Sequence, residues 1–185
     1  ALVRDIVARG HELASHGMGH QRVHTLSAGA FQADVRDSKA LLEDISGAPV
    51  RGYRAPSFSI DARTPWAHEV LRDCGYRYSS SVFPLKTDHY GMPEAPRFVY
   101  RPFDDDGFLE IPPTTAEVGG RRLPCAGGGY FRLLPVALFT RAMRRVVERD
   151  REACVFYFHP WEVDPDQPRV PGLGARARFR HYLNL

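Results

Sequence analysis

Two histidines lie four positions apart in the stretch "ELASHGMGHQ", where His16 and His20 flank the turn-forming residues Gly17-Met18-Gly19. Neutral imidazole is the commonest protein ligand for zinc and similar divalent cations. Two glycines disfavour a helix by about 1 kcal/mol each relative to alanine, so the sequence predicts a loop that turns both rings towards one point. Such a pair still needs a further ligand, typically a carboxylate. Taken alone, the spacing also fits two polar loop histidines without a metal.

Arg54 and His159 are the other candidates for chemistry. Arg54 stands before the rigid Pro56 in "VRGYRAP", where a guanidinium can grip a carboxylate through two donors or form a surface salt bridge. His159 ends the apolar run "ACVFYF" and could serve as a general acid, or be a core histidine bonded to backbone. Trp161 and Glu162 follow directly and either line a sugar-binding wall or cap the predicted strand.

The elements that must position these residues alternate between helix and strand. Apolar spacing predicts helices over residues 1–9, from the N-cap Ser27 to Gly47, from Thr64 to Gly75, and from Pro135 to about Glu148. Strands are predicted over 11–15, 50–56, 76–83 and 153–158, the last as a strand buried on both faces of a parallel sheet. A hairpin is predicted around Gly119-Gly120, a long irregular loop over residues 84–107, and a loop at "AGGGYF".

This alternation predicts an α/β fold with a parallel sheet, open or closed into a barrel. Catalytic groups in such folds gather at the C-terminal ends of strands. Three predicted strands end at His16/His20, at Arg54 and at His159. The sequence therefore predicts that these residues meet at one edge.

Composition narrows the function classes. The chain has 185 residues with 43% apolar and 25% charged side chains and a net charge of +3, which fits one globular domain. The arginine-rich stretch 141–151 has no interleaved aromatic residues, so nucleic-acid binding is not expected, and no apolar run approaches a membrane span. Cys74, Cys125 and Cys154 are expected to be buried free thiols, which favours the cytoplasm over the periplasm.

Taken together, these stretches resemble the NodB-homology polysaccharide deacetylases. "HGMGH" is similar to the family's His-Ser/Thr-x-x-His motif, "RAP" to its Arg-x-Pro motif, and "FYFH" to its apolar strand ending in histidine. A subfamily linked to exosortase and exopolysaccharide loci is similar over "RGHELASHG", "SKALLEDISG", "RGYRAPSFSI", "LPCAGGGYFRLLP", "VFYFHPWEVDPDQPR" and "RFRHYLNL". The resemblance covers nearly the whole chain.

The resemblance implies an irregular (β/α)7-type barrel and a metal-dependent hydrolase. His16 and His20 would hold a divalent metal, usually zinc, and an aspartate oriented by Arg54 would be the general base. A backbone N–H near Ser57 or Phe58 would help to stabilise the oxyanion.

The same resemblance implies the substrate class. It is a polysaccharide or oligosaccharide with N-acetylhexosamine units, hydrolysed to acetate and a free amino sugar. His159 would protonate the departing amine, and Trp161 and Tyr130 are expected to contact the sugar.

Three departures from the family pattern stand out. The acidic pair that supplies the third metal ligand and the base is absent; the family places it before residue 1, so we expect a single deacetylase domain that lacks its first β/α unit or units and is inactive by itself. Asp5 and the run Asp104 to Asp106 are not obvious substitutes. Gly17 replaces Ser or Thr, with a modest effect expected. Ser79 stands where the subfamily often has Asp; this change weakens the acid if that Asp supports His159, or position 79 lies at the surface.

Two other functions remain open. Relatives of this fold resemble hydrolases of cyclic amides and imides, which need a deep closed pocket. A non-catalytic carbohydrate-binding domain would use Tyr90, Tyr130 and Trp161 as stacking platforms.

Overall fold

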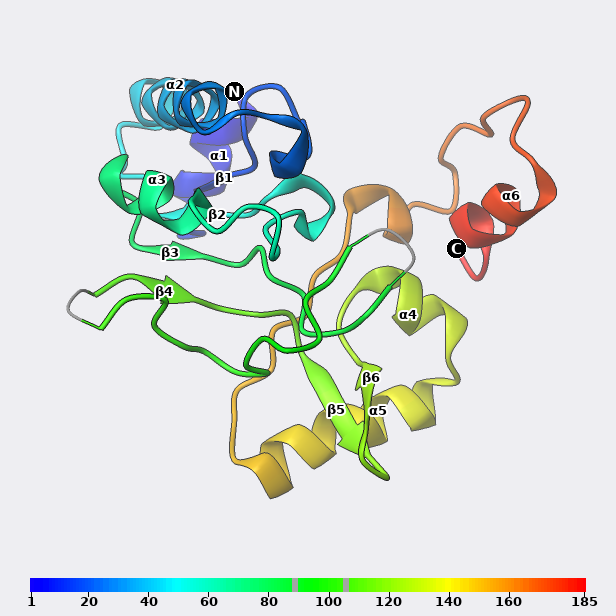
Figure 1. Cartoon of the computed structure of the whole chain (residues 1–185). Helices are drawn as coiled ribbons and strands as arrows, with labels where there is room; N and C mark the ends of the chain where they lie inside the picture. Colours follow the sequence, from blue (N-terminus) through cyan, green and yellow to red (C-terminus); the bar gives the residue numbers. More distant parts are fainter. Residues whose placement is uncertain (88–89, 105–106) are drawn as a thin grey trace. The chain divides into compact units, whose positions relative to one another are not determined.

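The computed structural model describes residues 1–87, 90–104 and 107–185. The chain forms two compact units, residues 1–112 and residues 113–185, called here the first and the second unit (Figure 1). Four residues of the predicted irregular loop, namely Asp88, His89, Asp105 and Asp106, lie outside the described residues. The described residues of that loop contain no helix and no strand beyond a single bridge at Tyr100, as predicted.

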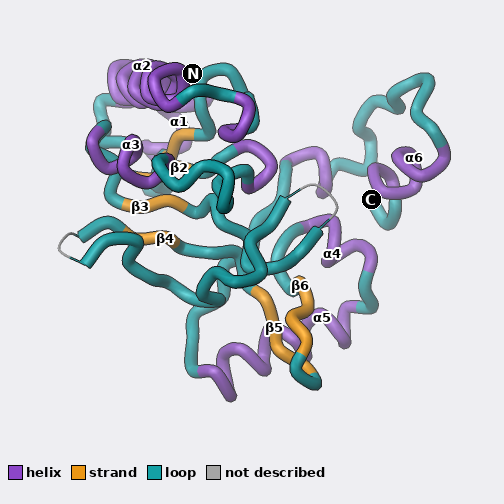
Figure 2. Tube along the Cα trace, in the orientation of Figure 1, coloured by secondary structure: helices purple, strands orange, loops and turns teal. Residues whose placement is uncertain are grey.

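The first unit contains a four-stranded parallel sheet in the order β1-β2-β3-β4 (Figure 2). Its strands are β1 (Ala14–Ser15), β2 (Gly52–Tyr53), β3 (Tyr78–Ser79) and β4 (Leu109–Glu110). The predicted α/β class with a parallel sheet is confirmed. Among the described residues the sheet is open, with β1 and β4 as its outer strands, so the barrel stays a prediction. Because all four strands run the same way, the residues that follow them share one edge of the sheet.

The helices of the first unit begin and end largely where the capping pattern predicts. They are α1 (Leu2–Ala8), α2 (Ala28–Ser46) and α3 (Ala67–Asp73). Ser27 Oγ accepts the Ala30 N–H at 3.2 Å, and Gly47 ends α2 with φ at 68°. The third helix begins later than Thr64, because Thr64 Oγ1 accepts the Asp61 N–H at 3.2 Å and forms a separate turn.

Aromatic packing holds α2 and α3 on the sheet. Tyr53 of β2 meets Phe31 at 5.7 Å and Tyr76 at 5.8 Å between ring centroids, in edge-to-face contacts. The Tyr76 hydroxyl donates to the Val35 carbonyl at 2.8 Å. These buried contacts fix the position of β2 against α2. They therefore also fix where the "RAP" turn begins.

The second unit begins with an antiparallel hairpin of β5 (Thr115–Val118) and β6 (Arg121–Pro124). Gly119 and Gly120 connect the strands at φ of 58° and 74°, which confirms the predicted hairpin. Figure 1 shows α5 beside this hairpin. The helices are α4 (Gly128–Leu133), α5 (Val136–Arg145) continued by a π-helical turn at Val146–Asp150, a 3₁₀ turn η4 (Pro160–Val163) and α6 (Ala175–Tyr182).

The loop predicted at "AGGGYF" is wrong in part, because Gly128 starts α4. These glycines are needed for close approach. A Cβ atom at Gly127 would lie 2.6 Å from the Tyr157 ring, and one at Gly128 would lie 2.5 Å from Glu162 Oε2. A glycine run that looks like a loop in sequence is here the tightly packed start of a helix.

The predicted buried strand over residues 153–158 is also wrong. The segment is extended but forms no strand, and Phe156 and Phe158 are 41% and 54% exposed. Its backbone bonds to other partners: Val155 N–H donates to Thr114 Oγ1 at 2.6 Å, and the Tyr157 carbonyl accepts the Gly128 N–H at 2.9 Å. An apolar run does not itself supply the neighbouring strand that a sheet requires.

Among the described residues the three cysteines form no disulfide. Cys125 is buried, as predicted, whereas Cys74 and Cys154 are half-buried. Burial raises the pKa of the Cys74 and Cys154 thiols. None of the helices in the described part of the chain is long and apolar enough to cross a bilayer.

Candidate functional site

His16 and His20 come together directly after β1. Their ring centroids are 4.9 Å apart at an interplanar angle of 72°, and both side chains are exposed. The residues between them form a loop, as the glycines predict. His16 Nδ1 lies 2.6 Å from the carbonyl oxygen of Arg54. Because a carbonyl only accepts, Nδ1 carries the proton, and the lone pair is on Nε2, the arrangement typical of metal-ligating histidines.

The carboxylate of Asp34 in α2 holds the loop between the two histidines. It accepts the Met18 N–H at 3.0 Å and the Gly19 N–H at 2.8 Å. Gly17 has φ at 81°, and a Cβ atom there would lie 2.7 Å from Asp34 Oδ2. Sequence reasoning missed Asp34, which lies within α2, 15 positions beyond Gly19, and has no local sequence signal for this role.

The pair fits half of a zinc site. Two imidazoles lie edge to face on one tight turn, and the tautomer of His16 is set by a backbone carbonyl. Within residues 1–87, 90–104 and 107–185, no three histidine, cysteine, aspartate or glutamate side chains gather in an arrangement that could hold a metal ion. The third ligand, expected as an aspartate before residue 1, stays a prediction.

Arg54 follows β2 and is tied to both neighbouring strands. Its backbone N–H donates to the Ser15 carbonyl at 2.9 Å. Its Nε donates to the Ser80 carbonyl at 3.1 Å and its Nη2 to Ser80 Oγ at 2.7 Å. The structure therefore brings Arg54 and His16 to the same edge of the sheet, with the guanidinium oriented by the end of β3.

Ser57, the predicted oxyanion donor, lies in a strained turn. Ser57 and Phe58 both have left-handed backbone, with φ of 55° and 47°. Non-glycine residues in this region cost about 1–3 kcal/mol each and persist only where the surroundings enforce them. Phe58 is buried against Phe83 and Tyr90 at 5.5 and 5.8 Å between ring centroids, which holds the turn from one side.

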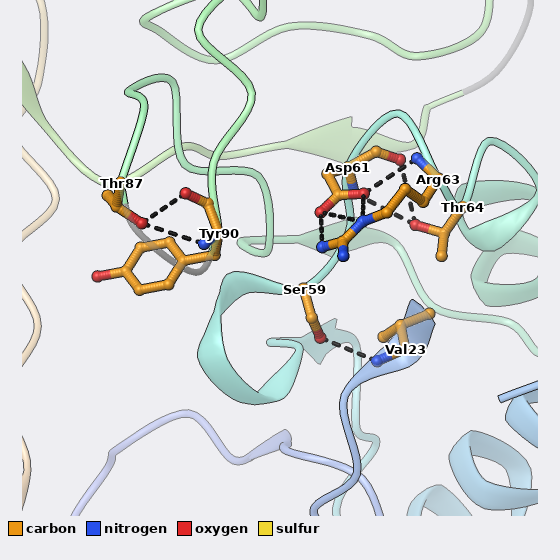
Figure 3. Close-up of polar contacts among 7 residues, drawn as sticks. All are labelled: Val23, Ser59, Asp61, Arg63, Thr64, Thr87 and Tyr90. Carbon is orange, nitrogen blue, oxygen red and sulfur yellow. Dashed lines mark hydrogen bonds and ion pairs between the residues drawn. The ribbon is translucent and has the colours of Figure 1, made fainter. Parts of the chain in front are cut away.

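Serine hydroxyls at the end of β3 and just after it also hold this turn. Ser79 and Ser81 share a hydrogen bond of 2.7 Å, and Ser81 Oγ accepts the Ala55 N–H at 2.9 Å. Ser79 is buried and supports the "RAP" turn, so the alternative of a surface position is wrong. Farther along, Ser59 Oγ accepts the Val23 N–H at 2.9 Å, as Figure 3 shows.

An ion pair between a buried aspartate and a half-exposed arginine follows this turn (Figure 3). Asp61 Oδ2 lies 2.6 Å from Arg63 Nη2, and its side chain is 7% exposed against 53% for Arg63. The hydrogen bonds from Arg63 hold the pKa of Asp61 below its ordinary value, although burial opposes this. Burial, with Arg63 nearby, lowers the pKa of His24.

His159, in the second unit, is not the end of a buried strand. It is the N-cap of η4, and its side chain is 55% exposed. Its backbone N–H donates to Glu162 Oε2 at 2.8 Å, and its Nδ1 lies 3.1 Å from the same oxygen. Its ring stacks on Trp161 at 5.5 Å with an angle of 19°. Glu162 therefore caps the 3₁₀ turn η4 and not the predicted strand, which does not form.

The two predicted sugar contacts also belong to the second unit. Trp161 stacks on His181 at 4.3 Å and has the Arg132 guanidinium carbon 5.3 Å from its ring centre. Tyr130 lies half-buried in α4. The seven site residues thus form two groups, one in each unit: His16, His20, Arg54 and Ser57 in the first, and His159, Trp161 and Tyr130 in the second.

Comparison with known proteins gives the family. Residues 1–79 match the model "Polysaccharide deacetylase", and residues 80–185, more than half of the chain, match "Domain of unknown function (DUF3473)". No curated protein matches.

Two solved structures share the fold. A chain from Mycobacterium smegmatis assigned as a polysaccharide deacetylase is 19% identical, covers 97% of this chain and 58% of its own, and has a TM-score of 0.59. One from Pseudomonas aeruginosa PAO1 with the same assignment is 16% identical, covers 80% of this chain and 43% of its own, and has a TM-score of 0.51. The present chain thus spans about half the length of these proteins. It belongs to the DUF3473 family, with the DUF3473 residues preceded by a segment that matches the polysaccharide deacetylase family.

Proposed function

We propose that this protein is a metal-dependent hydrolase that removes N-acetyl groups from amino-sugar units of a polysaccharide, in the biosynthesis of an exopolysaccharide. The observation that carries the proposal is the pair His16 and His20, with rings 4.9 Å apart at the carboxyl edge of a parallel sheet. The pair lies in the segment that matches the polysaccharide deacetylase family. Arg54, whose carbonyl accepts the His16 Nδ1 proton, stands at the same edge.

Each residue has a defined task in this proposal. A divalent metal held by His16 and His20, zinc by the nature of the donors, would supply Lewis acidity towards the amide carbonyl and a bound water. Arg54 would orient the carboxylate that serves as general base. The Ser57 N–H would donate to the oxygen on which negative charge develops.

The second half of the reaction is assigned to the second unit. His159 would give a proton to the amine nitrogen as the C–N bond breaks, so that acetate and a free amino sugar leave. Trp161 and Tyr130 would contact the sugar ring through their aromatic faces. The exposure of the His159 side chain supports access to a substrate.

Acetate release tests the proposal. The complete protein is incubated with N-acetylglucosamine oligomers, and acetate is measured for the wild type, the double variant His16→Ala, His20→Ala and the control His11→Ala. His11 is an exposed histidine outside the loop. We expect loss of acetate in the double variant and no change in the control. Undiminished acetate release in the double variant would refute the proposal. A cyclic imide in the same assay tests the alternative hydrolase.

One observation favours a non-catalytic carbohydrate-binding function as second candidate: in the described ranges no third metal-ligating side chain joins the two histidines. Two of the residues expected to stack on sugar in that function already contact other rings of the protein. Tyr90 packs on Phe58 and Phe83, and Trp161 stacks on two histidines. Oligosaccharide binding by the complete protein without acetate release would select this function.

A further inference from the structure

The side chain of Glu162 is buried beneath the exposed ring of His159. It is 5% exposed, and its Oε2 receives both the backbone N–H and the Nδ1 of His159, at 2.8 and 3.1 Å. Because an ionised carboxylate offers only acceptors, the imidazole must donate from Nδ1. The lone pair of the neutral ring is then on Nε2.

A second buried charge keeps Glu162 in this position. Arg132 Nη2 lies 3.3 Å from Glu162 Oε1, and both side chains are 5% exposed. A buried carboxylate is retained only where an opposite charge and hydrogen bonds compensate its desolvation. Space for it exists because Gly128 has no side chain: a Cβ atom there would lie 2.5 Å from Oε2.

The C-terminal segment in turn fixes Arg132. Its Nη1 donates to the carbonyls of Leu183 and His181 at 2.7 and 3.2 Å, and its Nη2 donates to the Arg180 carbonyl at 3.4 Å. Asn184 returns a bond from Nδ2 to the Arg132 carbonyl at 2.7 Å. The guanidinium fork is therefore held on one side by backbone carbonyls and on the other by the carboxylate.

The remaining neighbours of His159 are aromatic. Trp161 stacks nearly parallel to its ring, His181 stacks on Trp161, and the Tyr157 ring lies edge-on at 6.3 Å. Among the residues that the structure describes, Glu162 supplies the carboxylate that bonds to the ring. The ring is thus held at one nitrogen and supported on one face.

We propose that Glu162 is the positioning residue of His159. Held by Arg132 and by residues 180–184, it sets the Nδ1–H tautomer of the neutral ring and directs Nε2 away from the protein. Nε2 would then take up a proton from water and, from the imidazolium form, give it to the leaving amine. The role of His159 in that exchange rests on the proposed deacetylase function, whereas the tautomer does not. If Glu162 only capped η4, the ring would show no dependence on its charge.

The tautomer is tested by ¹⁵N NMR of the His159 ring in this chain at about pH 8.5, where an ordinary imidazole is neutral. We expect Nδ1–H in the wild type and a shift towards Nε2–H in Glu162→Gln, which retains an acceptor for the backbone cap. The control Glu148→Gln removes an exposed carboxylate of the same unit and should leave the spectrum unchanged. A wild-type ring in the Nε2–H form overturns the proposal without any variant, and so does an unchanged ring in Glu162→Gln.

Kinetics of the complete protein form the second test. Partners that orient a metal-ligating histidine typically matter by about 10–100-fold, and we expect Glu162→Gln to lower kcat by a similar factor with KM nearly unchanged. Glu162→Asp, which keeps the charge, should recover part of the loss, and Glu148→Gln should match the wild type. An equal kcat in Glu162→Gln overturns the positioning role. A wild type that releases no acetate refutes the deacetylase function but leaves the NMR result decisive for the tautomer.

Discussion

A Cβ atom at residue 17 would lie 2.7 Å from Asp34 Oδ2, so the glycine in the histidine loop and the aspartate of α2 depend on each other. The wider family resembled by this chain favours Ser or Thr at that position, and the sequence alone suggests that the difference matters little. The structure gives it a larger role. Here the loop is held from outside by a carboxylate that occupies the space of the missing side chain.

Gly17→Ser should therefore destabilise the first unit by about 1–3 kcal/mol, because serine is strained at φ of 81° and collides with Asp34. Asp34→Ala should cost about 1–2 kcal/mol through the two lost N–H bonds. The double variant should be more stable than the sum of the two effects predicts, since the collision is gone. Urea denaturation of the four proteins measures this. If the two destabilisations simply add in the double variant, Gly17 and Asp34 do not depend on each other.

Zinc binding by this chain should be weak, because the described residues offer two imidazoles without a third ligand beside them. After dialysis against metal-free buffer we expect well below one equivalent of zinc per chain by atomic emission. His16→Ala and His20→Ala should each remove what remains, whereas His11→Ala should not. Near-stoichiometric zinc in the wild type would show that a further ligand is present.

Ser80 should affect turnover more than stability. It bonds to Arg54 through both its carbonyl and its hydroxyl, and Ser80→Ala removes only the 2.7 Å bond to Nη2. Freed on that side, the guanidinium should orient the base less well, and kcat/KM of the complete protein should fall about tenfold. Thr140→Ala, which removes an exposed hydroxyl from α5, is the control. Equal activity of Ser80→Ala and wild type would argue against a role for the Arg54 orientation.

Asp61 should make the first unit sensitive to acid. Its pKa is lowered in the folded protein, chiefly by hydrogen bonds from Arg63. The ionised Asp61 therefore adds to the free energy of unfolding above the unfolded pKa of about 3.9. This contribution is lost as the pH falls through the lowered folded pKa. Asp61→Asn should be less stable at pH 7, by about 1 kcal/mol since Arg63 is half exposed, and its stability should fall less steeply between about pH 5 and 2. Denaturation at several pH values measures this, and parallel curves for the two proteins would exclude it.

Arg132→Met should strongly destabilise the second unit. It leaves Glu162 buried without its partner charge, which costs about 3–5 kcal/mol in comparable cases. Arg141→Met on the exposed side of α5 is the matched control and should be nearly neutral. Thermal unfolding followed by tryptophan fluorescence is suitable, because Trp161 contacts Arg132. A stability equal to the control would mean that the pair contributes little.

Local signals predicted much of the fold. Ser27 and Gly47 mark the two ends of α2 because the bonds that stop a helix lie within a few residues of them. Gly119-Gly120 marks the hairpin for the same reason. The run over residues 153–158 misled because burial depends on what packs against it, and its partners, Thr114 and Gly128, lie far away in sequence.

The candidate site divides in the same way. The proximity of His16 and His20 follows from a four-residue spacing and a glycine turn. Asp34, Ser80 and Arg132 are separated from the residues they hold by 15 or more positions, and nothing in their local sequence points to that role. The residues that could react were thus accessible to sequence reasoning, while those that orient them were not.

The left-handed pair Ser57 and Phe58 has a consequence for how this protein would tolerate change. The unfavourable dihedral angles are accepted when the chain folds, so in the proposed hydrolase the Ser57 amide would need no rearrangement when the oxyanion forms. Glycine at position 57 would relieve the backbone strain and raise the melting temperature. The N–H of residue 57 would then have no single fixed direction. Selection for heat resistance alone would favour that exchange, and selection for turnover would oppose it.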